Sequence, residues 1–172
     1  MKLIELSFLQ TIASKFVLLI NPHVLHNISK YIAIYKSLYL AAIENIGTCY
    51  VEIGVYKGSS FKHAIRTSKK FAKYNNNFNF LKFYGYDSFE GFEKKDKDKS
   101  KNIFFKEHNF VSDYDKLLKQ TRKLLRNDRF ELIKGNFSDV FNRKNNMNEK
   151  ISVFFIDCDF YDVAFESLNY FS

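Results

Sequence analysis

The sequence predicts an α/β domain in which short strands form a doubly wound parallel sheet. Four apolar runs of strand length alternate with longer segments of helical periodicity. Polar breaks separate these segments, and an acidic residue lies at or just beyond the end of each apolar run. Strands that alternate with helices favour parallel pairing through right-handed crossovers.

The amino-terminal part is predicted to be helical. Apolar positions recur at helical spacing over residues 2–20, and Asn21-Pro22 ends this helix. A second helix is expected at Asn27–Asn45, with one apolar face that packs on the following domain. The members of this face are Ile28, Ile32, Tyr35, Leu38, Tyr39 and Ala42. We therefore expect a helical cover over residues 1–46 and the sheet domain over residues 47–172.

The sheet domain begins with a strand, a turn and a helix. The strand is Cys49–Ile53, and the helix is expected from Ser60 to about Tyr74. Ser59 and Ser60 are residue types that cap helix starts well. The remaining expected elements are a strand at Phe80–Tyr86, a helix at Asp113–Asn127, a strand at Phe130–Ile133, a strand at Ile151–Ile156 and a helix from Asp162. Polar loops are expected at residues 75–77, 90–101 and 142–148, and Lys94–Lys101 is interpreted as a solvated lid.

Composition limits the classes of function. The 172 residues suit one domain. The net charge of +8 would suit a protein that binds nucleic acid. However, only five of the 27 basic residues are Arg, the residue favoured for forked phosphate and base contacts. The two cysteines suit neither a zinc site nor a disulfide framework, which favours a reducing compartment.

The amino terminus is not expected to enter a membrane. Glu5, Gln10 and Lys15 interrupt its apolar residues, and a bilayer span needs about 20 apolar residues in succession. Glu5 and Lys15 also break the core that a signal peptide requires. These features predict a cytoplasmic protein without a membrane span.

The segment Tyr50–Ser60 carries the first functional signal. Glu52 ends a buried strand, and Gly54 and Gly58 allow a tight turn and the close approach of a ligand. A Gly-x-x-x-Gly spacing alone also fits an ordinary strand-to-helix turn, so both interpretations stay open on this segment.

Four segments in order resemble class I S-adenosylmethionine-dependent methyltransferases, and more narrowly the macrocin O-methyltransferase family. They are Val51–Ser59, Phe83–Phe92, Glu131–Asp139 and Phe155–Tyr161, within roughly residues 31 to 172. The resemblance implies a Rossmann-like sheet of seven strands, of which this sequence supplies about four. The family's later Asp-Asp motif would lie beyond Ser172, so we expect a chain truncated at its carboxyl end.

The predicted cofactor is S-adenosylmethionine, bound at the carboxyl ends of the strands. Asp87 is placed to accept hydrogen bonds from both ribose hydroxyls, with Ser88 assisting, and the resemblance assigns adenine contacts to Asn136 and Phe137. The expected cofactor-binding residues are Glu52, Gly54, Tyr56, Gly58, Ser59, Asp87, Ser88, Asn136 and Phe137. The alternatives are a surface turn for Asp87 and a core position for Phe137.

The acidic pair after the last strand is the candidate catalytic group. By the resemblance, Asp157 is the base and a metal ligand, and Asp159 joins it, because carboxylates suit Mg²⁺. Whether Mg²⁺ assists is left open, since the family's further ligands lie downstream. The alternative for Asp157 is a cap on the following helix, and His108 is a weaker candidate near the acceptor.

The leading prediction is an S-adenosylmethionine-dependent O-methyltransferase acting on a hydroxyl of a sugar or other small molecule. A non-catalytic, truncated cofactor-binding remnant is the second interpretation. A basic nucleic-acid-binding module is the third, and salt-dependent binding to a random oligonucleotide would support it. Homo-oligomerisation is left open.

Overall fold

The computed structural model describes residues 3–92, 110–143 and 147–172. The chain divides into two compact units, residues 1–33 and 34–172. Helix α1 (Leu3–Val17) belongs to the first unit, and helix α2 (Pro22–Ile43) begins in the first unit and ends in the second. Among the described helices, none combines the length and apolarity that crossing a bilayer requires.

Helix α2 starts five residues earlier than the sequence predicted. The Asn21 side-chain oxygen accepts a hydrogen bond of 2.9 Å from the His23 backbone N–H, which is a helix-capping contact. Pro22 then occupies the first helical position, where its missing N–H is not needed. The proline that was expected only to end the first helix therefore also begins the second.

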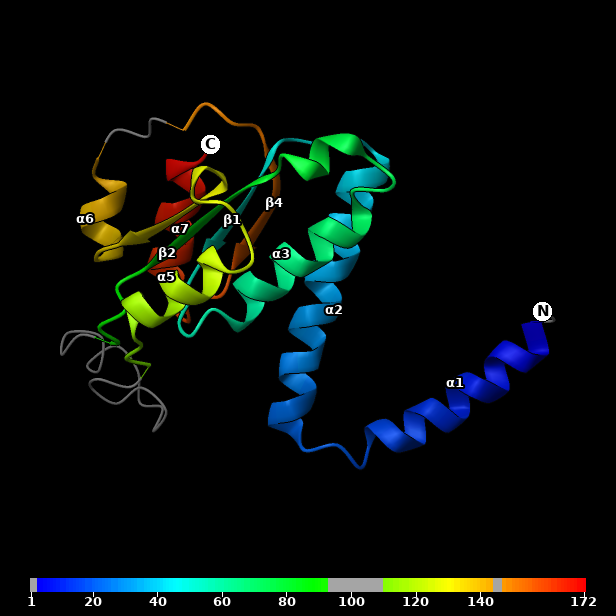
Figure 1. Cartoon of the computed structure of the whole chain (residues 1–172). Coiled ribbons are helices and arrows are strands. Elements are labelled where there is room, and N and C mark those ends of the chain that lie inside the picture. The colour runs from blue at the N-terminus through cyan, green and yellow to red at the C-terminus, as the bar shows by residue number, and fades with distance from the viewer. Residues whose placement is uncertain (1–2, 93–109, 144–146) are drawn as a thin grey trace. The chain divides into compact units, whose positions relative to one another are not determined.

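The second unit contains the predicted parallel sheet, which is confirmed (Figure 1). Its strands are β1 (Cys49–Ile53), β2 (Lys82–Asp87), β3 (Phe130–Lys134) and β4 (Ile151–Ile156), in the order β3-β2-β1-β4. All three pairings are parallel. The chain winds outward from β1 to β3 and then returns to the other side of β1, so the winding reverses between β1 and β4.

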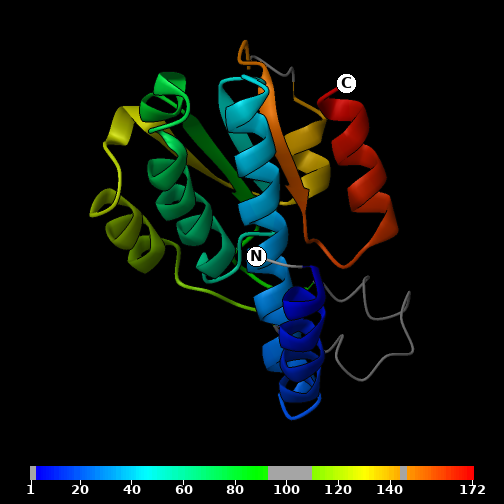
Figure 2. The ribbon, with the colours of Figure 1, turned by 90° about the vertical axis from the view of Figure 1, so that its right-hand side faces the viewer.

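Helices cover both faces of this sheet (Figure 2). Among the described residues, the helices after β1 are α3 (Ser59–Phe71), α5 (Tyr114–Arg122), α6 (Phe137–Phe141) and α7 (Tyr161–Tyr170), with short 3₁₀ turns at Asn76–Asn79 and Asn127–Arg129. The sequence did not predict α6, because five residues are too few to show helical periodicity. Every residue of β1 is buried, as expected for a central strand covered on both faces.

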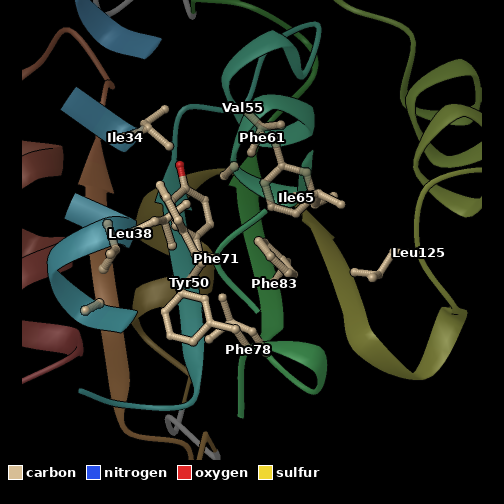
Figure 3. Packing of buried hydrophobic residues seen from close by; sticks show 14 of the residues in the cluster. Ile34, Leu38, Tyr50, Val55, Phe61, Ile65, Phe71, Phe78, Phe83 and Leu125 are labelled. Carbon is tan, nitrogen blue, oxygen red and sulfur yellow. The ribbon is translucent and has the colours of Figure 1, made fainter. Parts of the chain in front are cut away.

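The first core lies between the sheet and helices α2, α3 and α5. Aromatic and aliphatic side chains from strands and helices interdigitate there, with Tyr50 and Phe83 on the sheet and Phe61 on α3 (Figure 3). From α2 the buried residues are Ile34, Leu38, Ala41 and Ala42. The buried face of α2 is therefore rotated about the helix axis from the face that the sequence predicted. Tyr35 and Tyr39 lie at the margin of the buried face, where each packs against the ring of Phe71.

The second core lies on the opposite face of the sheet. It joins Cys49, Val51 and Ile53 of β1 to Val140 of α6 and Ala164 of α7. Since successive side chains of a strand point to opposite faces, Tyr50 and Glu52 face the first core. Both cysteines are buried and free, as the sequence predicted.

Candidate functional site at the carboxyl edge of the sheet

Three of the predicted acids lie at the carboxyl ends of neighbouring strands. Glu52 is the second-last residue of β1, Asp87 is the last residue of β2, and Asp157 directly follows β4. The Asp157 backbone N–H donates to the Ile53 carbonyl at 2.9 Å, so the ends of β1 and β4 lie together where the winding reverses. A crevice at such a reversal is the usual ligand site of open parallel sheets.

The turn after β1 is left-handed at three positions. The φ angles are 88° at Gly54, 51° at Tyr56 and 69° at Gly58. A Cβ at Gly54 would lie 2.2 Å from the Asp157 carbonyl oxygen, and one at Gly58 would lie 2.2 Å from Cδ1 of Leu117. The sequence predicted that a ligand would approach the backbone closely at these glycines. In the structure, Asp157 and Leu117 of the same chain make this close approach. A ligand contact at these glycines stays a prediction.

Neither predicted serine caps α3. The helix is preceded by Gly58, with no capping side-chain hydrogen bond, and Ser59 and Ser60 are its first two residues. Ser59 is exposed, whereas Ser60 is buried and its hydroxyl donates to Oε1 of Glu52 at 2.6 Å. The N-cap prediction was wrong because a buried carboxyl, rather than the helix backbone, is the partner nearest to Ser60.

Glu52 is fully buried and binds two hydroxyls. Besides Ser60, Tyr50 donates to Oε2 of Glu52 at 2.6 Å. Burial raises the pKa of Glu52 to about 8, the two hydrogen bonds oppose this increase, and Asp157 and Asp87 add to it. At neutral pH Glu52 is therefore mainly the uncharged acid. Sequence reasoning missed the roles of Tyr50 and Ser60, although the two-residue spacing of Tyr50 and Glu52 indicates a shared strand face.

Asp87 ties the end of β2 to the turn after β1. Its Oδ2 accepts from the Tyr56 backbone N–H and its Oδ1 from the Phe89 backbone N–H, both at 2.7 Å. Burial raises the pKa of Asp87, and these backbone hydrogen bonds oppose the increase. A carboxylate offers about four lone-pair positions, so Asp87 retains acceptor capacity for a ligand.

The Ser88 hydroxyl is engaged within its own loop. It accepts from the Glu90 backbone N–H at 3.2 Å and donates to the Gly91 carbonyl at 3.4 Å. In this structure Ser88 shapes the connection after β2, and its contact with a cofactor stays a prediction.

The two residues predicted to contact adenine lie at the start of α6. Asn136 is in the capping position but makes no side-chain capping bond, and the Ser138 hydroxyl donates to its side-chain oxygen at 3.4 Å. Phe137 packs with the second core and stacks on Phe141 at a centroid distance of 5.8 Å. Phe137 is thus half-buried at the margin of this core, and its stacking on adenine stays a prediction.

The acidic pair after β4 is partly accessible. Asp157 is half-buried and Asp159 is exposed, with a left-handed φ of 62°. Helix α7 is preceded by Phe160, which makes no side-chain capping bond, and a capping role for Asp157 stays the alternative. Within the described residues, no group of three or more His, Cys, Asp or Glu side chains is arranged to hold a metal ion. His108 and Lys94–Lys101 lie outside the described residues.

Comparisons with known proteins place this fold among methyltransferase structures. The chain matches CalS11, a calicheamicin methyltransferase, with a TM-score of 0.66 and 16% identity over 94% of this chain and 65% of that one. It matches the O-methyltransferase NovP with a TM-score of 0.61 and 15% identity over 81% and 57%. The chain thus spans less than two thirds of either protein.

No protein-family model matches the sequence, and no curated protein matches it. At these identities the structural likeness establishes the shared α/β fold. The narrower macrocin O-methyltransferase assignment stays a prediction.

Proposed function

We propose that this chain binds S-adenosylmethionine and belongs to an O-methyltransferase acting on a hydroxyl of a small molecule. The observation that carries the proposal is that Asp87 and Asp157 lie at the carboxyl ends of β2 and β4, the strands on either side of β1, next to the point where the winding of the sheet reverses. Asp157 and Asp87 both raise the pKa of Glu52, and hydroxyls rather than a cation oppose them. Such an edge favours a cationic ligand.

The chemistry of these residues fits the cofactor. S-adenosylmethionine has a cationic sulfonium and an ammonium group, which an acidic edge would attract. Asp87 retains acceptor lone pairs for the two ribose hydroxyls, while its backbone contacts hold it in place. The fold shared with CalS11 and NovP supports this interpretation by analogy.

We assign the proton-accepting role to Asp157. When bound, S-adenosylmethionine supplies a methyl group to the acceptor oxygen, so that an oxygen–carbon bond forms while the carbon–sulfur bond breaks and its electron pair stays on sulfur. Asp157 would accept the hydroxyl proton, and its position at the end of β4 beside Gly54 supports this role. The turn after β1 would help to hold the two reactants at a fixed distance and orientation, which lowers the entropic cost of the reaction.

Magnesium assistance stays a prediction of the family resemblance. Asp157 and Asp159 supply two carboxylates, and Mg²⁺ takes six ligands, often several of them waters. The described residues bring no third acidic or histidine ligand to this pair. We therefore derive no catalytic step from a metal.

A non-catalytic cofactor-binding protein is the second candidate. The chain spans 65% of CalS11 and 57% of NovP, so methyl transfer by the whole protein belongs to the proposal. Methyl transfer to an acceptor separates the two candidates, whereas cofactor binding is common to both.

Titration calorimetry with S-adenosylmethionine and S-adenosylhomocysteine tests the shared part of the proposal. We expect both to bind, and Asp87→Ala to weaken both. Asp128→Ala is the matched control, because Asp128 is an exposed acid that pairs with Arg126 in the turn before β3. If neither compound gives a binding signal when it is titrated into the folded protein, the proposal is overturned.

A further inference from the structure

Positive charge is concentrated on helices α3 and α5. Residues 59–73 and 113–123, which are these helices with the residues next to them, hold nine Lys and Arg but only two acids. The remaining described residues hold ten Lys and Arg and thirteen acids. We call the nine Lys and Arg residues of 59–73 and 113–123 the basic face. Its charge is therefore a local feature and not the average of the surface.

The two helices lie side by side on the same face of the sheet, where both contribute to the first core (Figure 1). Lys62 Nζ on α3 donates a hydrogen bond to the side-chain oxygen of Gln120 on α5. Further along, Lys69 Nζ donates to the backbone carbonyl of Leu124, just after α5. The basic side chains of α3 and α5 thus belong to one continuous surface.

Basic residues form a row along each helix. They follow one another at steps of three or four residues, which keeps them on one side of the helix. The members of the rows are Lys62, Arg66 and Lys69 on α3, and Lys116, Lys119 and Lys123 on or directly after α5. Lys62 is half-buried, and the other five are exposed. Each row extends for about 10 Å, because a helix rises 1.5 Å per residue.

The cations of the two rows are close enough to act on one another. Burial lowers the pKa of Lys62, and the positive charges of Arg66 on the same helix and Lys116 on the other lower it further. In the part of the chain that the structure describes, the basic face takes part in no ion pair. Like charges held close together repel one another, and a bound anion relieves this repulsion.

A stiff polyanion matches this surface better than a flexible one. A nucleic-acid duplex carries one phosphate charge per about 1.7 Å of its axis, and DNA bends little over lengths far greater than about 10 Å. An acidic peptide, by contrast, loses conformational entropy when a surface orders it. Arg66 is the only Arg in the two rows, and Arg is the residue most often used to read bases. The rows therefore suit phosphate contacts rather than base contacts.

We propose that the basic face binds the phosphate backbone of a nucleic-acid duplex, independently of base sequence. This function goes beyond the proposed methyl transfer and does not depend on it. The basic face runs along α3 and α5, whereas the proposed cofactor site is at the carboxyl edge of the sheet.

The test measures binding of the whole chain by fluorescence anisotropy, between about 50 and 200 mM salt. The probes are a DNA duplex and an RNA duplex of one arbitrary sequence, a single strand of that DNA, and poly-L-glutamate of equal charge. We expect a duplex to bind most tightly, and the DNA and RNA arms to show which duplex is preferred. The logarithm of its affinity should fall linearly with the logarithm of the salt concentration.

A double substitution, Arg66→Gln with Lys116→Gln, removes one cation from each row. It should weaken duplex binding and lower the magnitude of the salt slope by about 2, because two phosphate contacts are lost. Arg143→Gln with Lys150→Gln is the matched control. It also removes one Arg and one Lys, both exposed and outside the two helices, and should leave the slope nearly unchanged.

Equal affinity and equal slope in the two double variants would overturn the assignment to the basic face. Tighter binding of the single strand or of poly-L-glutamate than of either duplex would overturn the choice of partner. Absence of duplex binding at about 50 mM salt would overturn both. Circular dichroism checks folding, and Lys119→Gln with Lys123→Gln provides a second variant that removes cations from the α5 row alone.

Discussion

The Ser60 hydroxyl donates a 2.6 Å hydrogen bond to Glu52 and so ties the start of α3 to the end of β1. Tyr50 holds the other oxygen of the same carboxyl. The turn after β1 lies between Glu52 and Ser60. The hydrogen bond between these two residues therefore fixes both ends of the turn from inside the core.

Glu52 is expected to make stability fall as pH rises. Its pKa is about 8 in the folded protein and 4.5 ordinarily, so between these values the folded state binds more protons than the unfolded state. The free energy of unfolding then decreases with rising pH, by at most about 1.4 kcal/mol per pH unit from this group. Glu52→Gln should remove this slope in urea unfolding at pH 5.5 and 7.5. Glu131→Gln, on the exposed side of β3, is the control, and an equal slope in wild type and Glu52→Gln would contradict the prediction.

Asp87→Ala is expected to weaken cofactor binding by roughly 1 to 3 kcal/mol, the scale of lost charge-assisted hydrogen bonds. The variant also leaves the Tyr56 and Phe89 backbone N–H groups without their carboxylate partner, so it should lower the free energy of unfolding. Asp87→Asn keeps one acceptor oxygen, so its cofactor affinity and its free energy of unfolding should both lie between those of the wild type and Asp87→Ala. Calorimetry and urea unfolding measure the two effects, and unchanged cofactor affinity in a folded Asp87→Ala protein would remove Asp87 from the site.

Gly54→Ala is expected to destabilise the protein by about 3 kcal/mol or more. The residue has a φ of 88°, and an added Cβ would lie 2.2 Å from the backbone carbonyl oxygen of Asp157, directly after β4. Gly135→Ala is the comparison, because its Cβ would meet only a Val140 methyl group at 2.9 Å, and a side chain can move. Thermal unfolding of both variants should show the larger loss for Gly54. A smaller loss of stability in Gly54→Ala than in Gly135→Ala would mean that the ends of β1 and β4 move apart easily to make room for the added methyl group.

Asp157→Asn is expected to lower methyl transfer sharply and to leave cofactor affinity nearly unchanged. The carboxylate is proposed to act on the acceptor proton, and Asn keeps the size of Asp but cannot serve as a base. Stability should change little, since Asn keeps the size of Asp and caps a helix about as well. Transfer of labelled methyl groups, measured beside calorimetry, separates the two effects. Full turnover by Asp157→Asn would refute its role as the base.

The strands could be predicted from the sequence because their signal is local. Cys49–Ile53 and Ile151–Ile156 are short, largely apolar runs bounded by polar residues, and the structure has both strands with these bounds. Their parallel pairing follows from the alternation with helices. The position of the acids at the carboxyl ends then follows from the parallel direction, so Glu52, Asp87 and Asp157 were placed correctly relative to the strands.

The partners of individual side chains depended on tertiary structure, because they lie far apart in the sequence or compete with a local alternative. Ser60 has the residue type of a helix cap, yet it binds Glu52, which β1 brings within 2.6 Å. Gly54 was expected to make room for a ligand, but its space faces the Asp157 carbonyl, about a hundred residues later in the chain. The rings of Tyr56, Phe110, Phe92 and Phe160 likewise come into contact from three separate connections. The sequence by itself determined which groups reach this edge, through local periodicity, and only the packing of β1 against β4 and α3 decided which of them touch.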